Sequence, residues 1–170
     1  MDFEPFIRTI NNFPKPGVSY KDITPLLNDA NAFKAASSAL YTLVNGASID
    51  KVVGVGSRGF IFAPLLADKL NAGFIPVRKK GKLPFGTLAE SYDLEYGTDE
   101  LEIHTDAIGR GERILVHDDV LATGGTARAV CNLVEKLGGE VVQCNFLIRL
   151  DFLNGGEKLN GYTISSLLRY

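Results

Sequence analysis

Blocks of apolar residues along the chain predict the strands of a buried sheet. Short and nearly continuous apolar runs are typical of strands that are covered on both faces of a parallel sheet. Such runs occupy residues 51–56, 74–77, 114–116, 140–148 and 162–168. Residues 85–110 are instead polar and punctuated by glycine. They predict a β-ribbon with a mobile connection, a kind of segment that often covers a binding site.

Helical spacing of apolar residues predicts the elements between these strands. One helix is expected over 32–45, with Asn31 as its cap and Gly46 as its stop. A second should follow the turn at Ser57–Phe60 and run to about Asn71. A third should end at Gly138–Gly139, and apolar spacing also favours a short helix over 2–11. Strands that alternate with helices indicate an α/β fold, namely a mainly parallel twisted sheet flanked by helices, with ligands at the carboxyl ends of the strands.

The stretch from Arg113 to Thr126 carries the strongest chemical signal. Two carboxylates, Asp118 and Asp119, come first, and a turn with the sequence Ala-Thr-Gly-Gly-Thr then leads into a helix. The N–H groups at a helix start, with roughly +0.5 of a charge, make such a turn an anion site. The residues of this turn are Ala122, Thr123, Gly124, Gly125 and Thr126. Carboxylates accept hydrogen bonds from sugar hydroxyls or hold a divalent cation, so the pattern favours a sugar phosphate over a connection without a ligand.

Two further segments offer partners for an anionic ligand. Ser57 and Arg58 lie in a second strand-to-helix turn, which is a weaker candidate anion site. Four cations lie within five positions, at Arg78, Lys79, Lys80 and Lys82. A solvated charge run explains many such clusters, but Arg and Lys here can also bind a polyanionic substrate.

Composition narrows the class of protein. The chain has 170 residues, 45% hydrophobic and 22% charged, which favours one globular domain. A formal net charge of −2 gives no support for a nucleic-acid partner, and no apolar run approaches the ~20 residues of a membrane span. Cys131 and Cys144 lack metal-like spacing and are expected to be buried in a reducing compartment. We expect a cytoplasmic protein, because the first residues also lack a signal-peptide pattern.

Four segments resemble one family. Residues 113–126 resemble the phosphoribosyl pyrophosphate (PRPP) motif of the type I phosphoribosyltransferases. The stiff segment at 13–27, the cation cluster at 78–84 and the stretch at 92–107 are similar to the adenine phosphoribosyltransferases within that family. The similarity runs from Phe13 to Tyr170. One difference is that relatives usually carry an acid where Gly56 stands.

The resemblance implies an activity and a role for each group of site residues. The reaction would convert adenine and PRPP to AMP and pyrophosphate with Mg²⁺. The protein would be a homodimer, and each chain would have a hood (about 1–27 and the C-terminal part) and a lid (about 79–104). Asp118 and Asp119 would hold the ribose, directly or through Mg²⁺ and water, and the turn after them the 5′-phosphate. Pyrophosphate would lie near Ser57, Arg58, Arg78, Lys79 and Lys82. Adenine would contact Val18, Ser19, Tyr20, Arg58 and Leu150, and Glu95 would handle its proton.

The sequence is also compatible with two alternatives. The same fold also serves transferases for hypoxanthine, xanthine or orotate, which present different hydrogen-bond groups to the protein. A regulator that binds PRPP without catalysis is a different class of protein. It would need a DNA-binding part, and no basic helix-turn-helix pattern precedes Phe13. His104 and His117 are expected to be ordinary strand residues.

Overall fold

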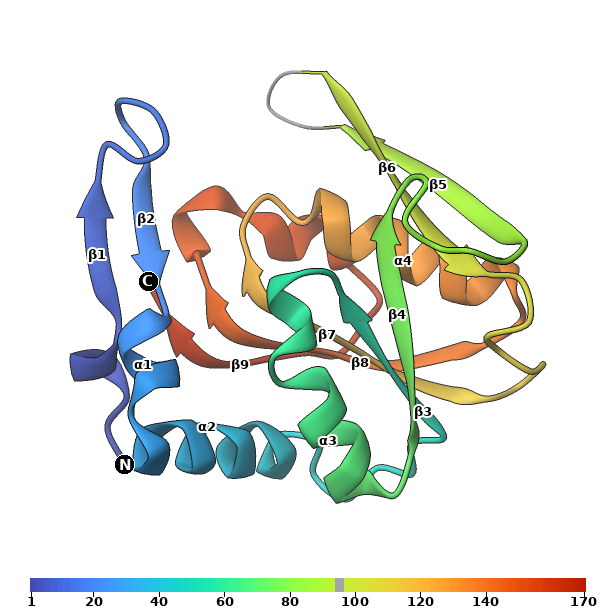
Figure 1. The fold of residues 1–170 in the computed structure, drawn as a ribbon, viewed down its shortest axis with the longest axis horizontal. Helices are drawn as coiled ribbons and strands as arrows, with labels where there is room; N and C mark the ends of the chain where they lie inside the picture. Colours follow the sequence, from blue (N-terminus) through green and yellow to red (C-terminus); the bar gives the residue numbers. More distant parts are fainter. Residues whose placement is uncertain (94–96) are drawn as a thin grey trace. The chain divides into compact units, whose positions relative to one another are not determined.

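The structure is a computed structural model that describes residues 1–93 and 97–170. The chain divides into two compact units, Met1–Ala39 and Leu40–Tyr170. Figure 1 colours the elements along the chain. Among the described residues, no helix has the length and apolar character that crossing a membrane requires.

The first unit contains a two-stranded hairpin and a helical segment. A 3-10 turn η1 (Glu4–Phe6) precedes the strands β1 (Arg8–Asn11) and β2 (Ser19–Asp22), which pair antiparallel. The prediction of a helix over 2–11 was therefore wrong. Its apolar spacing is divided between η1 and β1, because Arg8 to Asn11 find hydrogen-bond partners in β2, a pairing that local periodicity does not report.

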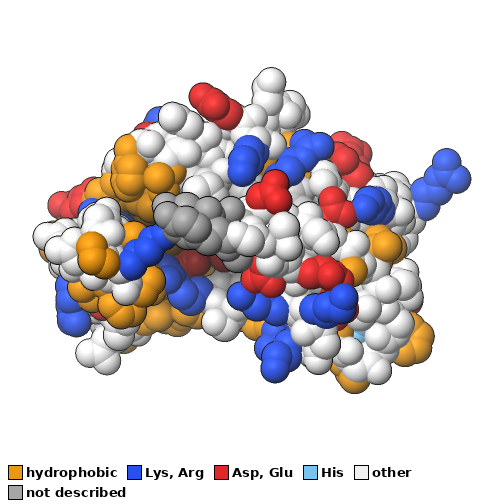
Figure 2. All heavy atoms as spheres, turned by 90° about the horizontal axis from the view of Figure 1, so that it is seen from above, with side chains coloured by type: hydrophobic (Ala, Val, Ile, Leu, Met, Phe, Trp, Pro, Cys, Tyr) orange, Lys and Arg blue, Asp and Glu red, His pale blue; other side chains and the backbone are white. Residues whose placement is uncertain are grey.

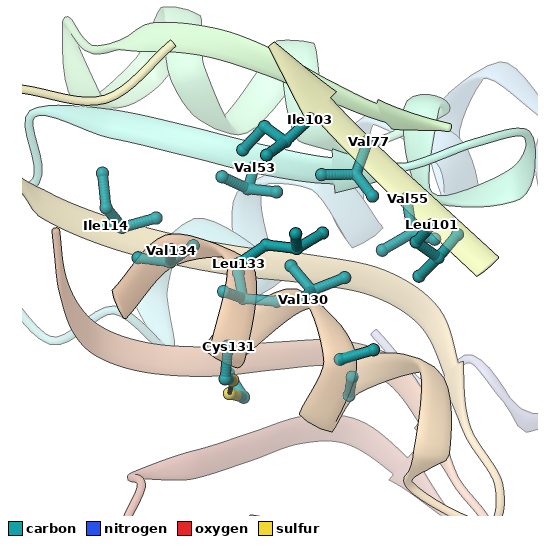
Figure 3. Close-up of a cluster of buried hydrophobic side chains, with 14 of the residues drawn as sticks. Val53, Val55, Val77, Leu101, Ile103, Ile114, Val130, Cys131, Leu133 and Val134 are labelled. Carbon is teal, nitrogen blue, oxygen red and sulfur yellow. Dashed lines mark hydrogen bonds between the residues drawn. The ribbon is translucent and has the colours of Figure 1, made fainter. Parts of the chain in front are cut away.

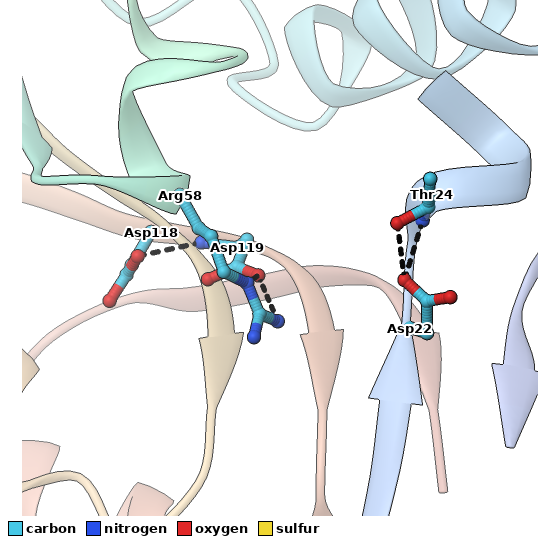
Figure 4. A network of polar contacts seen from close by, with 5 residues as sticks. All are labelled: Asp22, Thr24, Arg58, Asp118 and Asp119. Atoms are coloured by element: carbon cyan, nitrogen blue, oxygen red, sulfur yellow. Dashed lines mark hydrogen bonds and ion pairs between the residues drawn. The ribbon is translucent and has the colours of Figure 1, made fainter. Parts of the chain in front are cut away.

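Two helices follow the hairpin. Asp22 Oδ1 accepts hydrogen bonds from the backbone N–H and the hydroxyl of Thr24, at 2.9 and 2.5 Å, where α1 (Thr24–Asn28) begins (Figure 4). The next helix, α2, spans Ala30–Thr42 rather than 32–45. Asp29, not Asn31, caps it, because Asp29 Oδ1 accepts the N–H groups of Asn31 and Ala32.

A seven-stranded sheet organises the second unit, with the order β5-β6-β4-β3-β7-β8-β9. The strands β3 (Lys51–Val55), β4 (Gly73–Lys79), β7 (Arg113–Leu121), β8 (Glu140–Arg149) and β9 (Ile164–Arg169) pair in parallel. The strands β5 (Thr87–Asp93) and β6 (Thr98–His104) form the antiparallel ribbon expected from the sequence. The predicted α/β class with a mainly parallel sheet is confirmed.

Helices cover both faces of this sheet. Val53 and Val55 face a core that includes Val130, Leu133 and Val134 of α4 (Gly125–Lys136), as Figure 3 shows. Gly54 faces the opposite way, where a Cβ would meet Ala63 of α3 (Ala63–Leu70) at 2.7 Å. Three 3-10 turns, η2 (Arg58–Phe60), η3 (Asp151–Leu153) and η4 (Gly155–Leu159), complete the element order. Cys131 and Cys144 are buried free cysteines, as expected.

A buried polar chain ties β7 and β8 to the last turn of α2. The amide nitrogen of Asn145 donates to the backbone oxygen of Leu40 at 3.2 Å, and Gln143 donates to that of Leu43 at 3.0 Å. The Asn145 oxygen therefore faces His117 Nδ1 at 3.0 Å, which makes Nδ1 the protonated ring nitrogen. These bonds satisfy carbonyl groups that a helix end leaves without partners.

Candidate active site

The Ala122–Thr126 turn forms a small cavity at the start of α4. A cavity of about 70 Å³ is lined by this turn together with Asp118, Val120, Leu121 and Ala127. Gly124 has φ = 81°, a left-handed conformation that glycine adopts without strain, and α4 begins at the next residue. The first N–H groups of α4 have no acceptor within the helix, so the cavity is suited to an anion.

Backbone contact with η4 fixes the shape of this turn. A Cβ on Gly124 would lie 2.2 Å from the Gly155 oxygen, and a Cβ on Gly155 would lie 2.0 Å from the Ala122 oxygen. Both positions must therefore be glycine for the two segments to approach this closely. Gly124 was predicted from the sequence as part of the turn, whereas the role of Gly155 was not.

The two acids lie within β7 rather than after it. The ladder with β8 continues through them, with Asp118 opposite Phe146, so the strand is longer than the apolar run 114–116 predicted. Successive residues of a strand point to opposite faces. The adjacent acids consequently have different partners, although both reach the carboxyl end of the sheet.

Asp119 is held by Arg58 (Figure 4). The Arg58 Nε donates to Asp119 Oδ2 at 2.5 Å, and its Nη2 contacts the same oxygen. Asp119 is 5% exposed, so this charge is compensated in a largely dry environment. The structure thereby brings together Arg58 and Asp119, which belong to separate motifs of the sequence.

Asp118 is in a different electrostatic state. Desolvation by the surrounding protein, followed by repulsion from Asp119, raises the pKa of Asp118 well above its usual range. Its Oδ1 accepts the backbone N–H of Asp119 at 2.9 Å. A Cβ on Gly59 would lie 2.9 Å from the same oxygen, so only glycine lets the Ser57–Phe60 turn approach Asp118 this closely. This role of Gly59 was not predicted from the sequence.

The cation cluster at 78–82 splits into paired and unpaired members. Lys79 Nζ lies 2.7 Å from Asp99, and Lys80 Nζ lies 3.1 Å from Glu100, both acids on β6. Within residues 1–93 and 97–170, Arg78 and Lys82 form no ion pair; the guanidinium of Arg78 lies over the Phe60 ring instead. Figure 2 likewise shows basic and acidic side chains interspersed on the face that it views.

Tyr92 and Asp99 join the β5–β6 ribbon to the cavity. The Tyr92 hydroxyl donates to Asp99 Oδ2 at 3.3 Å, and Tyr92 also interacts with the side chain of Thr126. A Cβ on Gly125 would lie 3.1 Å from the Asp93 oxygen, so the end of β5 packs on the start of α4. A chain of polar contacts therefore runs from Thr126 to Lys79. No local pattern predicts this set of contacts, because its members are far apart along the chain.

The remaining predicted site residues have these positions. Val18, Ser19 and Tyr20 belong to the first unit, where the Tyr20 ring meets Phe13 edge-on at 5.2 Å. Leu150 is buried in the second unit, where its N–H donates to the Leu121 oxygen at 2.9 Å. Ser57 is exposed at the start of η2. Glu95, the predicted proton acceptor, lies outside the described residues.

The sequence matches the phosphoribosyl transferase domain family over residues 22–160. The chain therefore belongs to the phosphoribosyltransferase family, in keeping with a fold that joins two acids, an anion cavity and a cluster of cations at one edge of a parallel sheet.

Individual relatives narrow the comparison. The chain is 61% identical to the adenine phosphoribosyltransferase of Christiangramia forsetii, over 100% of this chain and 99% of that protein. A crystal structure of adenine phosphoribosyltransferase from Rhodothermus marinus is 53% identical, with a TM-score of 0.94 over 99% of this chain and 96% of that chain. The Saccharomyces cerevisiae enzyme, solved with an imino-altritol bisphosphate and adenine, is 39% identical, with a TM-score of 0.92 over 98% and 96% of the two chains.

Proposed function

We propose that the chain transfers the phosphoribosyl group of PRPP to adenine and gives AMP and pyrophosphate, a reaction of purine salvage. The observation that carries the proposal is the juxtaposition of Asp118 and the anion cavity at the end of β7. Arg58 follows the neighbouring strand β3, and Arg78 lies on β4, the strand next to β3. Full-length relatives with the name adenine phosphoribosyltransferase support adenine as the base.

The 5′-phosphate would bind in the cavity. The N–H groups at the start of α4 and the hydroxyls of Thr123 and Thr126 would donate to its oxygens. This grip is remote from the reacting carbon, so its binding energy would serve to position C1 of the ribose. The ribose hydroxyls would then reach Asp118, which lines the same cavity, and Asp119.

Departure of pyrophosphate determines where positive charge is needed. Cleavage of the bond between C1 and pyrophosphate leaves positive charge on the ribose and negative charge on the leaving group. Arg78, Lys82 and the Ser57–Arg58 turn would stabilise the leaving group, and Lys79 would join them if it left Asp99. Adenine would attack C1 and lose its N9 proton, and Glu95 remains the predicted acceptor of that proton. The residues proposed to contact the base are Val18, Ser19, Tyr20, Arg58 and Leu150.

Mg²⁺ fits the donor set only as a partner of the substrate. Among residues 1–93 and 97–170, no three His, Cys, Asp or Glu side chains gather as a metal site. Asp119 is already engaged by Arg58, so Asp118 is the carboxylate best able to hold the ion, through water and PRPP oxygens. When bound, Mg²⁺ would supply compensation of the pyrophosphate charge.

The proposal extends to organisation. We place the activity in a single domain that acts as a cytoplasmic homodimer, with the N-terminal segment of about 1–27 and the C-terminal part as a hood and about 79–104 as a lid. Light scattering on the purified chain tests the oligomeric state, and a monomeric mass at micromolar concentration would contradict the dimer.

A turnover assay with a panel of bases tests the reaction. The purified chain receives PRPP and Mg²⁺ with adenine, hypoxanthine, guanine, xanthine or orotate in separate reactions, and nucleotide and pyrophosphate are quantified. We expect AMP from adenine alone. Product from another base would mean that the enzyme is specific for that base and not for adenine. PRPP binding without any product would favour a non-catalytic PRPP regulator.

A further inference from the structure

The side chain of Arg78 occupies the space that a side chain at position 56 would need. A Cβ built on Gly56 would lie 2.7 Å from Arg78 Cδ, 2.8 Å from Arg78 Nε and 2.7 Å from Phe60 Cζ. Contacts under 3.0 Å are essentially never seen for real Cβ atoms, so a side chain at position 56 would require the Arg78 and Phe60 side chains to shift. The glycine thus leaves the space in which the Arg78 side chain lies.

Phe60 supports the guanidinium of the same arginine. The Arg78 Cζ atom lies 5.5 Å from the centre of the Phe60 ring, within the range of a cation–π contact. The ring of Phe60 in turn meets Phe74 of β4 edge-on, at 5.6 Å between centres. Arg78 is therefore oriented by a packed aromatic surface, without a carboxylate partner in the part of the chain that the structure describes.

The sheet places this guanidinium at the same edge as the two acids. Gly54 of β3 is level with His117 of β7, and Val55 is level with Val77 of β4. The chain therefore passes Asp118 of β7, Arg78 of β4 and Gly56, which directly follows β3, at similar heights. An anion that departs from a sugar held at Asp118 would meet a positive charge that no acid among residues 1–93 and 97–170 neutralises.

We propose that Gly56 and Phe60 are positioning residues that hold Arg78 ready for the pyrophosphate group, an inference that rests on the proposed function. The ring orients the guanidinium, and the missing side chain at position 56 leaves room for it. An acid at position 56 would have two effects in this chain. It would displace Arg78 and Phe60, and it would neutralise the charge that binds the anion.

Substitutions at Phe60 test the role of the ring. Calorimetry measures binding of pyrophosphate with Mg²⁺ and, separately, of ribose 5-phosphate, for Phe60→Leu, Phe60→Tyr and the unaltered chain. We expect Phe60→Leu to weaken pyrophosphate binding about tenfold and to leave ribose 5-phosphate within about twofold. Phe60→Tyr keeps an aromatic face and should bind pyrophosphate normally. Tyr41→Leu, an exposed aromatic position on α2, is the matched control.

Each outcome of this comparison decides the inference. Equal losses for both ligands in Phe60→Leu, or an equal loss in Phe60→Tyr, would mean a general structural role and would overturn it. Unchanged pyrophosphate binding in Phe60→Leu would overturn it as well. If the unaltered chain binds neither pyrophosphate nor ribose 5-phosphate, the proposed function itself fails, and the two failures are thus distinguishable.

Substitutions at Gly56 test the space and the charge separately. Gly56→Ala adds only the displacing Cβ, whereas Gly56→Asp adds a counter-charge. We expect weaker pyrophosphate binding in both, with the larger loss for aspartate. In an Arg78→Ala background, which removes the displaced group, Gly56→Asp should have little further effect on pyrophosphate affinity. Tight pyrophosphate binding by Gly56→Asp, or an undiminished loss in the Arg78→Ala background, would contradict the inference.

Discussion

Asp99 of β6 forms an ion pair with Lys79 of β4, with 2.7 Å between Oδ2 and Nζ. The pair raises the pKa of Lys79 and lowers the pKa of Asp99, and in both cases their mutual hydrogen bond is the main cause. Lys79 was predicted from the sequence to bind pyrophosphate. In this structure its charge is already compensated by the ribbon.

Release of Lys79 should strengthen pyrophosphate binding. Asp99→Asn removes the counter-charge and retains the shape of the side chain. Exposed ion pairs contribute about 0.2–1 kcal/mol, so we expect pyrophosphate to bind about twofold to fivefold more tightly, as measured by calorimetry. Glu100→Gln, which frees the neighbouring Lys80, is the control. An equal gain in Glu100→Gln would point to general electrostatics rather than to Lys79.

Removal of both acids of β7 should stop turnover without unfolding the chain. In Asp118→Asn with Asp119→Asn, the ribose hydroxyls lose their charged acceptors, and the reacting carbon is no longer held in place. We expect kcat/KM for PRPP to fall at least about a hundredfold, with circular dichroism unchanged. Full activity in the folded double variant would refute the assignment of these acids to the ribose.

Asp118→Asn alone should also make the fold more stable. The raised pKa of Asp118 means that the folded chain disfavours its ionised form, whereas the unfolded chain does not. Above the ordinary carboxyl pKa, ionisation therefore costs stability, and asparagine avoids this cost while it keeps an acceptor for the Asp119 N–H. Denaturant unfolding at pH 7 should show a gain of about 1 kcal/mol, and a loss of stability would contradict the argument.

A branched side chain at Gly125 should damage the phosphate cavity. A Cβ there would lie 3.1 Å from the Asp93 oxygen and 3.4 Å from Tyr92 Cδ2, so valine would push the end of β5 away from α4. We expect Gly125→Val to weaken ribose 5-phosphate binding about tenfold, and Gly125→Ala to have a smaller effect. Both affinities are measured by calorimetry, with pyrophosphate as the control ligand. Unchanged ribose 5-phosphate affinity in Gly125→Val would argue against the cavity as the binding site of ribose 5-phosphate.

His117 should make the folded chain sensitive to acid. Burial lowers the pKa of His117 to about 4 from 6.5, so the unfolded chain binds a proton at this residue well before the folded chain does. Stability should therefore fall as pH decreases from 6.5 towards 4, by about 2 kcal/mol between pH 7 and pH 5 from this residue. His117→Gln can still donate to Asn145 but does not titrate. Unfolding curves at both pH values should show a smaller loss for this variant, and an equal loss would exclude His117 as the cause.

Local patterns predicted most of the second unit. The strand and turn around Asp118 and the helix that ends before Gly138 have their signals within a few consecutive residues, and the structure contains them. The failure at 2–11 has a physical reason, because β1 exists only through pairing with Ser19–Asp22. The same reason explains why β7 extends past its apolar residues, since β8 supplies hydrogen-bond partners beyond them.

The residues of the candidate site likewise divide into those that local patterns predict and those that depend on contacts with distant residues. Asp118, Gly124 and the cations of 78–82 could be found from the sequence, because type and spacing alone suggest an anionic sugar. The contributions of Phe60 and Tyr92 could not be found in this way. An aromatic residue in a helical turn or a strand is ordinary core material until a distant partner, Arg78 or Thr126, is known to contact it.

The contact between Gly124 and Gly155 limits how this protein can be redesigned. Neither residue has a smaller replacement, so a larger side chain at one position cannot be accommodated by a change at the other. A library that varies only residues 122–126, in search of a transferase for a different sugar phosphate, would consist mainly of chains that no longer form the cavity. Productive variants would have to change residues 150–159 at the same time, because the two segments can be altered only together.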